Sequence, residues 1–203
     1  MKEPQSKPSD RRLLHTRQVS CSGYLRDDGL IDIEGRLLDT KPHDVEDVYR
    51  TIPAGDPFHR MRVVMTVDSD FVIRNLSAFT DAAPTPYCAG ITTAYAALEG
   101  VKVGPGFRNV VAERLGGDKG CTHLTELLGP MATTLYQSTM HMWVEAQRQR
   151  VESDASYEPP TPFVIGSCHG YRTDGEPARR LQQRWGEWRG GAMTAAPDDS
   201  QPR

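Results

Sequence analysis

The spacing of apolar residues changes once along the 203-residue chain, and this change limits the folds open to it. Residues 15–41 alternate apolar and polar side chains, which is the two-residue period of a half-buried strand, and residues 60–80 contain two runs rich in strand-forming residues. Turn residues at 27–29 and 68–70 interrupt these stretches, so each predicts a β-hairpin. Later residues show the helical period instead. Strands followed by helices predict an α+β fold, an antiparallel sheet meander with helices packed on one face.

Three helices are expected in the second half, over residues 88–99, 107–115 and 122 to about 150. The first two stop at glycines, which commonly follow the last helical residue. The third contains Pro130, which should kink or break it. Residues 161–177 predict one more strand and a turn.

Composition indicates how the chain is organised around these elements. The segments 1–12 and 189–203 are polar or small and should be disordered, which leaves a single domain over 13–188. Residues 42–59 mix Pro, Gly and acids and predict a loop or a short helix. Possible assembly into a homo-oligomer is left open.

Charge and hydropathy exclude several classes of partner. The formal charge is −3 and the basic residues are scattered, so we expect no nucleic acid. No apolar run approaches the roughly 20 residues of a membrane span, and the N-terminus lacks a signal peptide's apolar core. We therefore expect a cytoplasmic protein with no membrane association. Its four isolated cysteines should be free thiols.

Cys121 and His123 stand at the start of the third expected helix, in the sequence Gly-Cys-Thr-His. The positive end of a helix favours a thiolate, and a nearby imidazole could pair with it or share a metal ion. Alternatively, Thr122 caps the helix, the thiol is buried and the histidine bonds the backbone. Both interpretations stay open.

A second polar group runs along the first expected hairpin, with Arg26 and Asp28 near its turn and Asp39 and Lys41 near its end. Turn aspartates and a solvated lysine are ordinary, so the group can be purely structural. It can equally form the rim of an active site, where Arg26 binds an anion and Lys41 acts as an acid or a base. His59 lies in a Gly/Pro loop, where functional groups are often presented.

Two stretches resemble the iron–sulphur cluster scaffold proteins of the NifU-like fold. In those proteins one helix opens at a cysteine after the sheet meander, as YCAGITTAYAALEGVKVG does at Cys88. A later helix opens at a second cysteine, as GCTHLTELLGPMATT does at Cys121. The resemblance covers roughly residues 60–140 and implies a NifU-like α+β fold.

The same resemblance implies a metal or sulphur carrier. Cys88 and Cys121 would lie close together and, with His123, bind zinc or an iron–sulphur cluster, to which Asp39 could add a ligand. In this interpretation the protein is a binding scaffold.

The chain from residue 15 to about 180 also resembles an uncharacterised bacterial family of unknown function. Its marks here are HTR at 15–17, RDDGL at 26–30, DTK at 39–41 and GCTHL at 120–124. This resemblance implies an enzyme of aromatic catabolism, a formaldehyde-releasing lyase that acts on lignin-derived phenols.

We therefore expect a cofactor-independent carbon–carbon lyase that binds a small phenolic aromatic and cleaves it by a retro-aldol type reaction. The reaction needs a base, an acid and a cation that stabilises the developing anion. The candidates are His59 or His123 as the base, Lys41 or Tyr24 as the acid, and Arg17, Arg26, Asp28 and Asp39 as substrate-binding residues.

Overall fold

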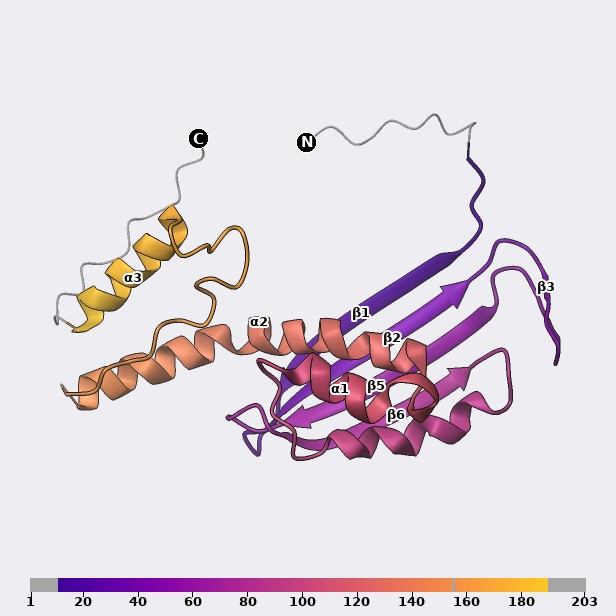
Figure 1. Cartoon of the computed structure of the whole chain (residues 1–203), viewed down its shortest axis with the longest axis horizontal. Coiled ribbons are helices and arrows are strands. Elements are labelled where there is room, and N and C mark those ends of the chain that lie inside the picture. Colours follow the sequence, from indigo (N-terminus) through magenta and orange to yellow (C-terminus); the bar gives the residue numbers. More distant parts are fainter. Residues whose placement is uncertain (1–10, 155, 190–203) are drawn as a thin grey trace. The chain divides into compact units, whose positions relative to one another are not determined.

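The computed structural model describes residues 11–154 and 156–189 (Figure 1). The chain forms two compact units, Met1–Ser138 and Thr139–Arg203, and each is described by itself. The segments 1–10 and 190–203, on which most of the expected terminal disorder falls, lie outside the described residues. One domain over 13–188 stays a prediction.

The first unit is built on a four-stranded antiparallel sheet. Its strands are β1 (Thr16–Leu25), β2 (Ile31–Thr40), β5 (Pro57–Val67) and β6 (Ile73–Ala82), in the order β1-β2-β5-β6. Both expected hairpins are present, β1–β2 and β5–β6. In the second turn, Asp68 Oδ1 accepts hydrogen bonds from the backbone N–H groups of Asp70 and Val72, which explains why an aspartate begins it.

A small hairpin joins β2 to β5, where a loop or a short helix was expected. Its strands are β3 (Val45–Glu46) and β4 (Thr51–Ile52). The side chain of Thr51 donates to Glu46, and Asp44 accepts from the backbone of Ala54. These side-chain bonds close the segment locally and leave no run long enough for a helix.

The expected helices follow the sheet. They are the 3₁₀-helix η2 (Cys88–Leu98), α1 (Phe107–Leu115), the short 3₁₀-helix η3 (Gly117–Lys119) and α2 (Thr122–Ser153). Pro130 does not break α2, because the helix runs on through it. Buried Leu127, Leu128 and Met131 hold the backbone on both sides of the proline, and this packing outweighs the lost hydrogen bond.

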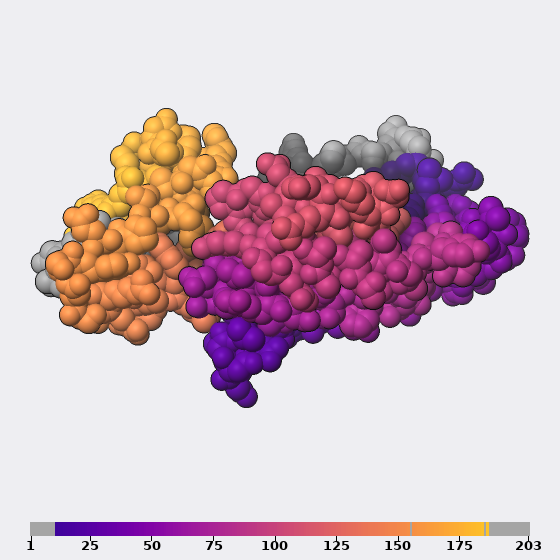
Figure 2. All heavy atoms as spheres, turned by 60° about the horizontal axis from the view of Figure 1, so that its bottom comes forward, coloured from indigo at the N-terminus to yellow at the C-terminus, as the bar shows by residue number. Residues whose placement is uncertain are grey.

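The helices pack on one face of the sheet, which confirms the α+β fold class. Residues 31, 33, 35, 37 and 39 of β2 all lie on the inward face of that strand, and the side chains among them are buried. The glycine at 35 lets α2 approach closely, since a Cβ there would lie 2.6 Å from the Sδ of Met131. In the space-filling view the helical segments of this unit, in pink to red, form a continuous layer over the purple strands (Figure 2).

The second unit contains the end of α2, the helix α3 (Glu176–Arg189) and turns between them. The strand expected within 161–177 is wrong, because this segment forms successive turns closed by backbone hydrogen bonds such as Ile165 N–H to Pro162 O. Gly166, at φ 79°, takes a left-handed conformation that ends any extended run. Trp143 packs edge-on against Phe163, with ring centroids 5.6 Å apart. Among the described residues, no helix has the length and apolarity needed to cross a bilayer.

Candidate functional site

The strand register places three polar residues side by side across the sheet. Arg17 of β1 pairs with Asp39 of β2, and Asp39 pairs with His59 of β5. Side chains of directly paired residues in antiparallel strands lie on the same face. For this row, which we call the polar row, that face is the one covered by α2, since Asp39 and Gly35 both point inward from β2.

Asp39 is fully buried, and four donors occupy its two carboxylate oxygens. Arg17 donates through Nε to Oδ1 and through a terminal nitrogen to Oδ2, each at 2.8 Å. His15 Nε2 lies 3.1 Å from Oδ1, and His59 Nδ1 lies 3.0 Å from Oδ2. The carboxylate therefore has the bidentate arginine pair and the full set of partners that a buried charge requires.

The charge of Asp39 decides how His59 is protonated. Burial raises the pKa of Asp39, but the hydrogen bond and the charge of Arg17, with the hydrogen bonds of His59 and His15, outweigh this and lower it to about 2. An ionised carboxylate only accepts hydrogen bonds, so His59 Nδ1 must carry the proton that it shares with Asp39. When His59 is neutral, its Nε2 then holds a free lone pair and can act as a base.

His123 lies against His59 from the start of α2. The two ring centroids are 3.8 Å apart and the ring planes are tilted by 31°. Burial lowers the pKa of His59, and the neighbouring His123 lowers it further, against the opposing effect of Asp39. Burial and the charge of Arg17 also lower the pKa of His123. Both imidazoles are therefore mainly neutral near pH 7.

Arg17 connects the polar row to α2. It donates to Glu126 Oε2 at 2.6 Å, while its other nitrogens hold Asp39. Its three guanidinium nitrogens thus bond to Asp39 and Glu126, which gives it a positioning task, and the expected contact with a substrate anion stays a prediction.

Lys41 lies near the same end of the sheet. Its Nζ is 5.4 Å from the centroid of the Phe58 ring, and that ring packs edge-on against His59 with centroids 5.0 Å apart. A proton donor at Lys41 therefore lies one aromatic ring away from the histidine pair.

Arg26 and Asp28 lie at the opposite end of the β1–β2 hairpin, which corrects the expectation that they share a rim with Asp39 and Lys41. Tyr24, a candidate acid, lies at that end too. Tyr24 pairs with Asp32, seven residues along β1 from Arg17, which corresponds to about 23 Å at the usual rise of a strand. Arg26 and Asp28 bond to one another beside the turn. A strand carries residues near its two ends to opposite edges of the domain, and closeness in sequence concealed this.

The two cysteines of the metal interpretation take up other contacts. The Cys88 Sγ lies 3.2 Å from the Thr85 hydroxyl. Cys121 packs against the core, and its backbone N–H and C=O both bond to the hydroxyl of Tyr95. Neither thiol belongs to a group of three or more metal-ligand side chains in the part of the chain that the structure describes. The residues therefore do not fit the expected zinc or cluster site.

Among the described residues, one other group has the composition of a metal site. Single ligand atoms of Asp39, His59 and His123 lie within 4.8 Å of one another. However, Asp39 already receives four hydrogen bonds. The two imidazole rings are stacked with planes tilted by 31°, so their in-plane lone pairs run side by side and do not converge on one metal position. The arrangement fits proton transfer better than metal coordination.

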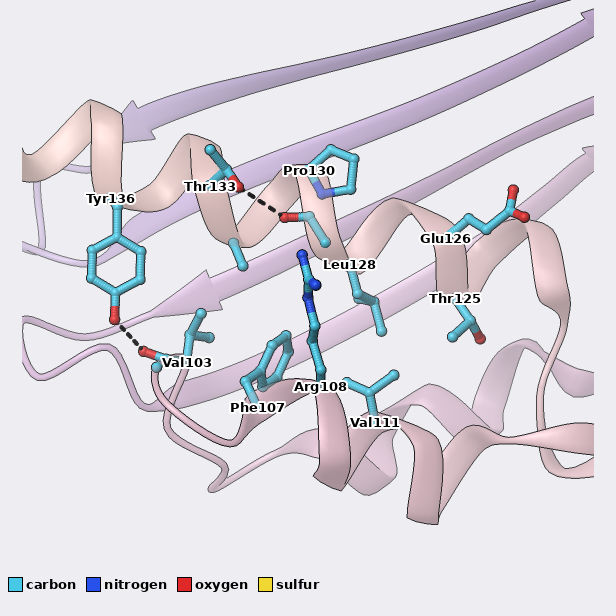
Figure 3. Close-up of a pocket in the computed structure, with 13 residues that line it drawn as sticks. Val103, Phe107, Arg108, Val111, Thr125, Glu126, Leu128, Pro130, Thr133 and Tyr136 are labelled. Atoms are coloured by element: carbon cyan, nitrogen blue, oxygen red, sulfur yellow. Dashed lines mark hydrogen bonds between the residues drawn. The ribbon is translucent and has the colours of Figure 1, made fainter. Parts of the chain in front are cut away.

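A cavity of about 500 Å³ lies between α1 and α2 (Figure 3). Its walls are mostly apolar, with Val103, Phe107 and Leu128 among them. Glu126 lines this cavity and also bonds to Arg17, so it connects the cavity wall to the polar row. The histidines do not line the cavity.

Sequence reasoning missed His15 and Glu126 as members of the site. The two-residue strand period places His15 on the same face as Arg17, and helical spacing places Glu126 one turn after His123. These two sequence spacings would have predicted that His15 and Glu126 belong to the site, but only if the register between β1 and β2 had been known.

A family model described as protein of unknown function (DUF2889) matches residues 15–137, which is more than half of the chain. The match starts at His15, as expected, and ends before residue 180. No curated protein and no solved structure matches the chain. Resemblance to a family of unknown function is thus confirmed, whereas the short motifs and the NifU-like resemblance stay predictions.

Proposed function

The chain belongs to the family of proteins of unknown function DUF2889, and we propose that in this member the polar row and His123 are the catalytic site of a lyase. Its substrate would be a small phenolic aromatic that carries a primary alcohol. The reaction would release formaldehyde and need no cofactor.

The observation that carries this proposal is the hydrogen bond from His59 to the buried Asp39. A carboxylate behind Nδ1 fixes the imidazole tautomer and orients Nε2, as in other carboxylate–histidine catalytic pairs. Stacking against His123 and burial keep this nitrogen unprotonated near neutral pH. A neutral, oriented imidazole is the group that general-base catalysis requires.

The proposed reaction starts by making an electron acceptor. Loss of the phenolic proton expels a benzylic oxygen substituent as an alcohol or water, and the ring becomes a quinone methide. His59 Nε2 then takes the proton of the primary alcohol. The carbon–carbon bond next to that alcohol breaks, formaldehyde leaves, and the electron pair restores the aromatic phenolate and forms an alkene. No oxidant or reductant is consumed.

The remaining residues divide the other tasks. Lys41, beyond the Phe58 ring, is the proposed acid that protonates the leaving oxygen. Arg17 and His15 act through Asp39, whose charge and orientation they hold. His123 is the second candidate base, since its ring is in contact with that of His59. Tyr24 lies too far away to take part.

The test is formaldehyde release from 4-hydroxyphenyl compounds that have a benzylic ether and an adjacent hydroxymethyl group. We expect the wild-type protein to turn over at least one of them, and His59→Gln to lower kcat/KM by about 10²- to 10⁴-fold. His43→Gln is the matched control, because His43 is an exposed loop histidine. Full activity in His59→Gln would show that His59 is not the base. No formaldehyde release from any of the compounds would contradict the proposed lyase activity.

Metal binding by Asp39, His59 and His123 is the second candidate function, on the ground of their mutual distances alone. Protein purified without chelator and carrying one zinc or iron per chain, lost in His123→Ala, would favour it. Formaldehyde release that persists after dialysis against a chelator would favour acid–base chemistry.

A further inference from the structure

The cavity between α1 and α2 has polar side chains that are almost all satisfied from within the protein. Thr133 donates to the backbone oxygen of Gly129, and Tyr136 donates to that of Val103. The hydroxyl of Thr125 lies 2.8 Å from that of Tyr95. These groups therefore need few hydrogen bonds from a bound ligand.

The charges of the cavity are unequal. Glu126 is neutralised by Arg17, at 2.6 Å. Arg108, on the first turn of α1, is exposed and makes no hydrogen bond or ion pair within the described residues. One positive charge is therefore left without an ion-pair partner among the described residues, at a cavity whose other charged lining residue is already paired.

Arg108 points into the cavity and not away from it. Figure 3 shows its guanidinium reaching from α1 toward Leu128 and Pro130 of α2, with the Phe107 ring beside its stem. Gly129 leaves space on the opposite wall, because a Cβ built there would meet nothing within 4 Å. The cavity thus combines an open slot with one cationic fork.

We propose that this cavity is a binding site for an aromatic monocarboxylate. The ring would lie in the slot between α1 and α2, and the carboxylate would take the free guanidinium of Arg108. A planar fork of donors matches a carboxylate in a bidentate way, and a cavity of about 500 Å³ lies within the range of small-molecule sites. This site is separate from the proposed catalytic site at His59, and the binding proposal does not depend on that reaction.

The test is calorimetric titration of the full-length protein with 2-naphthoate and with its neutral counterpart 2-naphthamide. We expect saturable binding of one naphthoate per chain, at least 10-fold tighter than the amide. Arg108→Gln should weaken naphthoate binding about 10- to 100-fold and leave the amide unchanged, because only the acid uses the charge.

Two further variants separate the cavity from the rest of the surface. Gly129→Leu, which fills the slot in a helix that accepts leucine well, should abolish binding of both probes. Arg60→Gln removes the same charge from an exposed position on the other face of the sheet and should change nothing. Circular dichroism of each variant shows that it is folded.

Three results would overturn the proposal. They are no binding of naphthoate to the wild-type protein, equal binding of acid and amide, and unchanged naphthoate affinity in Arg108→Gln. His59→Gln that still binds naphthoate but releases no formaldehyde would show that the two sites are distinct.

Discussion

Asp39 is the residue on which the candidate site depends. Its carboxylate is bonded to His15, Arg17 and His59, and it has no access to solvent. A buried carboxylate with so many partners affects the site by orienting the side chains that are hydrogen-bonded to it.

Replacing Asp39 with asparagine tests this role. The amide no longer demands a proton on His59 Nδ1, so the histidine can take the wrong tautomer, and we expect kcat/KM for formaldehyde release to fall on the order of 10²- to 10⁴-fold. Asp32→Asn is the control, since Asp32 lies on the opposite face of the same strand. Equal turnover in both variants would show that Asp39 is only structural.

Arg17 contributes to stability through the same carboxylate. Arg17→Gln leaves the buried charge of Asp39 without its main partner, and we expect urea unfolding at pH 7 to show a loss of about 3–5 kcal/mol. Arg26→Gln, which breaks an exposed pair, should cost less than about 1 kcal/mol.

The pH dependence of that difference has a definite sign. The pKa of Asp39 is lowered to about 2 when folded, so its stabilisation is complete above its unfolded value near 3.8 and is lost as the pH falls toward 2. The gap between wild type and Arg17→Gln should therefore shrink between about pH 4 and pH 2. A gap that is constant with pH would separate Arg17 from the charge of Asp39.

The histidine pair sets the expected pH profile of activity. A base must be unprotonated, and burial lowers the pKa of both His59 and His123. Activity should thus be constant near pH 7 and fall only below the ordinary histidine pKa of about 6.5. In Asp39→Asn the midpoint should move to still lower pH, because the carboxylate that raises the pKa of His59 is gone. A midpoint above 6.5 in the wild-type protein would contradict these assignments.

At the scale of elements, the packing of α2 on β2 brings His123 to His59. Gly35 permits this contact, and an alanine there would overlap with Met131. The distance between helix and strand is therefore a condition for the site as well as for the core.

Gly35→Ala should destabilise the protein by about 1–3 kcal/mol in urea unfolding, the usual result of overpacking. In a background that already carries Met131→Ala, adding Gly35→Ala should cost less stability than it costs in the wild-type protein, since the clashing atoms are gone. Gly129→Ala is the control and should stabilise slightly, because it adds a better helix former in open space. Destabilisation of equal size in both glycine variants would show that backbone effects, not the helix contact, are responsible.

At the scale of the molecule, the candidate site and the cavity lie in one compact unit. The core cluster runs from Ile31 to Leu135, the unit ends at Ser138, and the family match ends at residue 137. These three boundaries agree, although they come from packing, contacts and sequence.

A chain that stops after Ser138 should therefore fold cooperatively. We expect a single urea transition and native-like far-ultraviolet circular dichroism, because all residues of the core cluster are kept. The full-length chain measured in parallel is the reference. A chain that binds a hydrophobic dye and shows no cooperative transition would mean that residues beyond 138 are needed for folding.

The amino-acid pattern alone was sufficient for the four long strands of the sheet, for the helices η2, α1 and α2 that follow them, and for their order. Alternating residues specified the hairpins and glycines marked the helix ends, because period and turn chemistry act over a few neighbouring residues. Local pattern failed at 161–177, where turns replaced a strand, and at Pro130 the helix does not break, which was one of the two expected outcomes there.

The composition of the site was decided by the tertiary structure. His59, His123 and Asp39 were candidates from the sequence, but so were Tyr24, Arg26 and Asp28, and nothing local separated the two sets. Strand register joined Arg17, Asp39 and His59 in one row, and the packing of α2 added His123 and Glu126. Residues up to 109 positions apart meet there, and contacts between such distant residues depend on the whole fold, which no local period encodes.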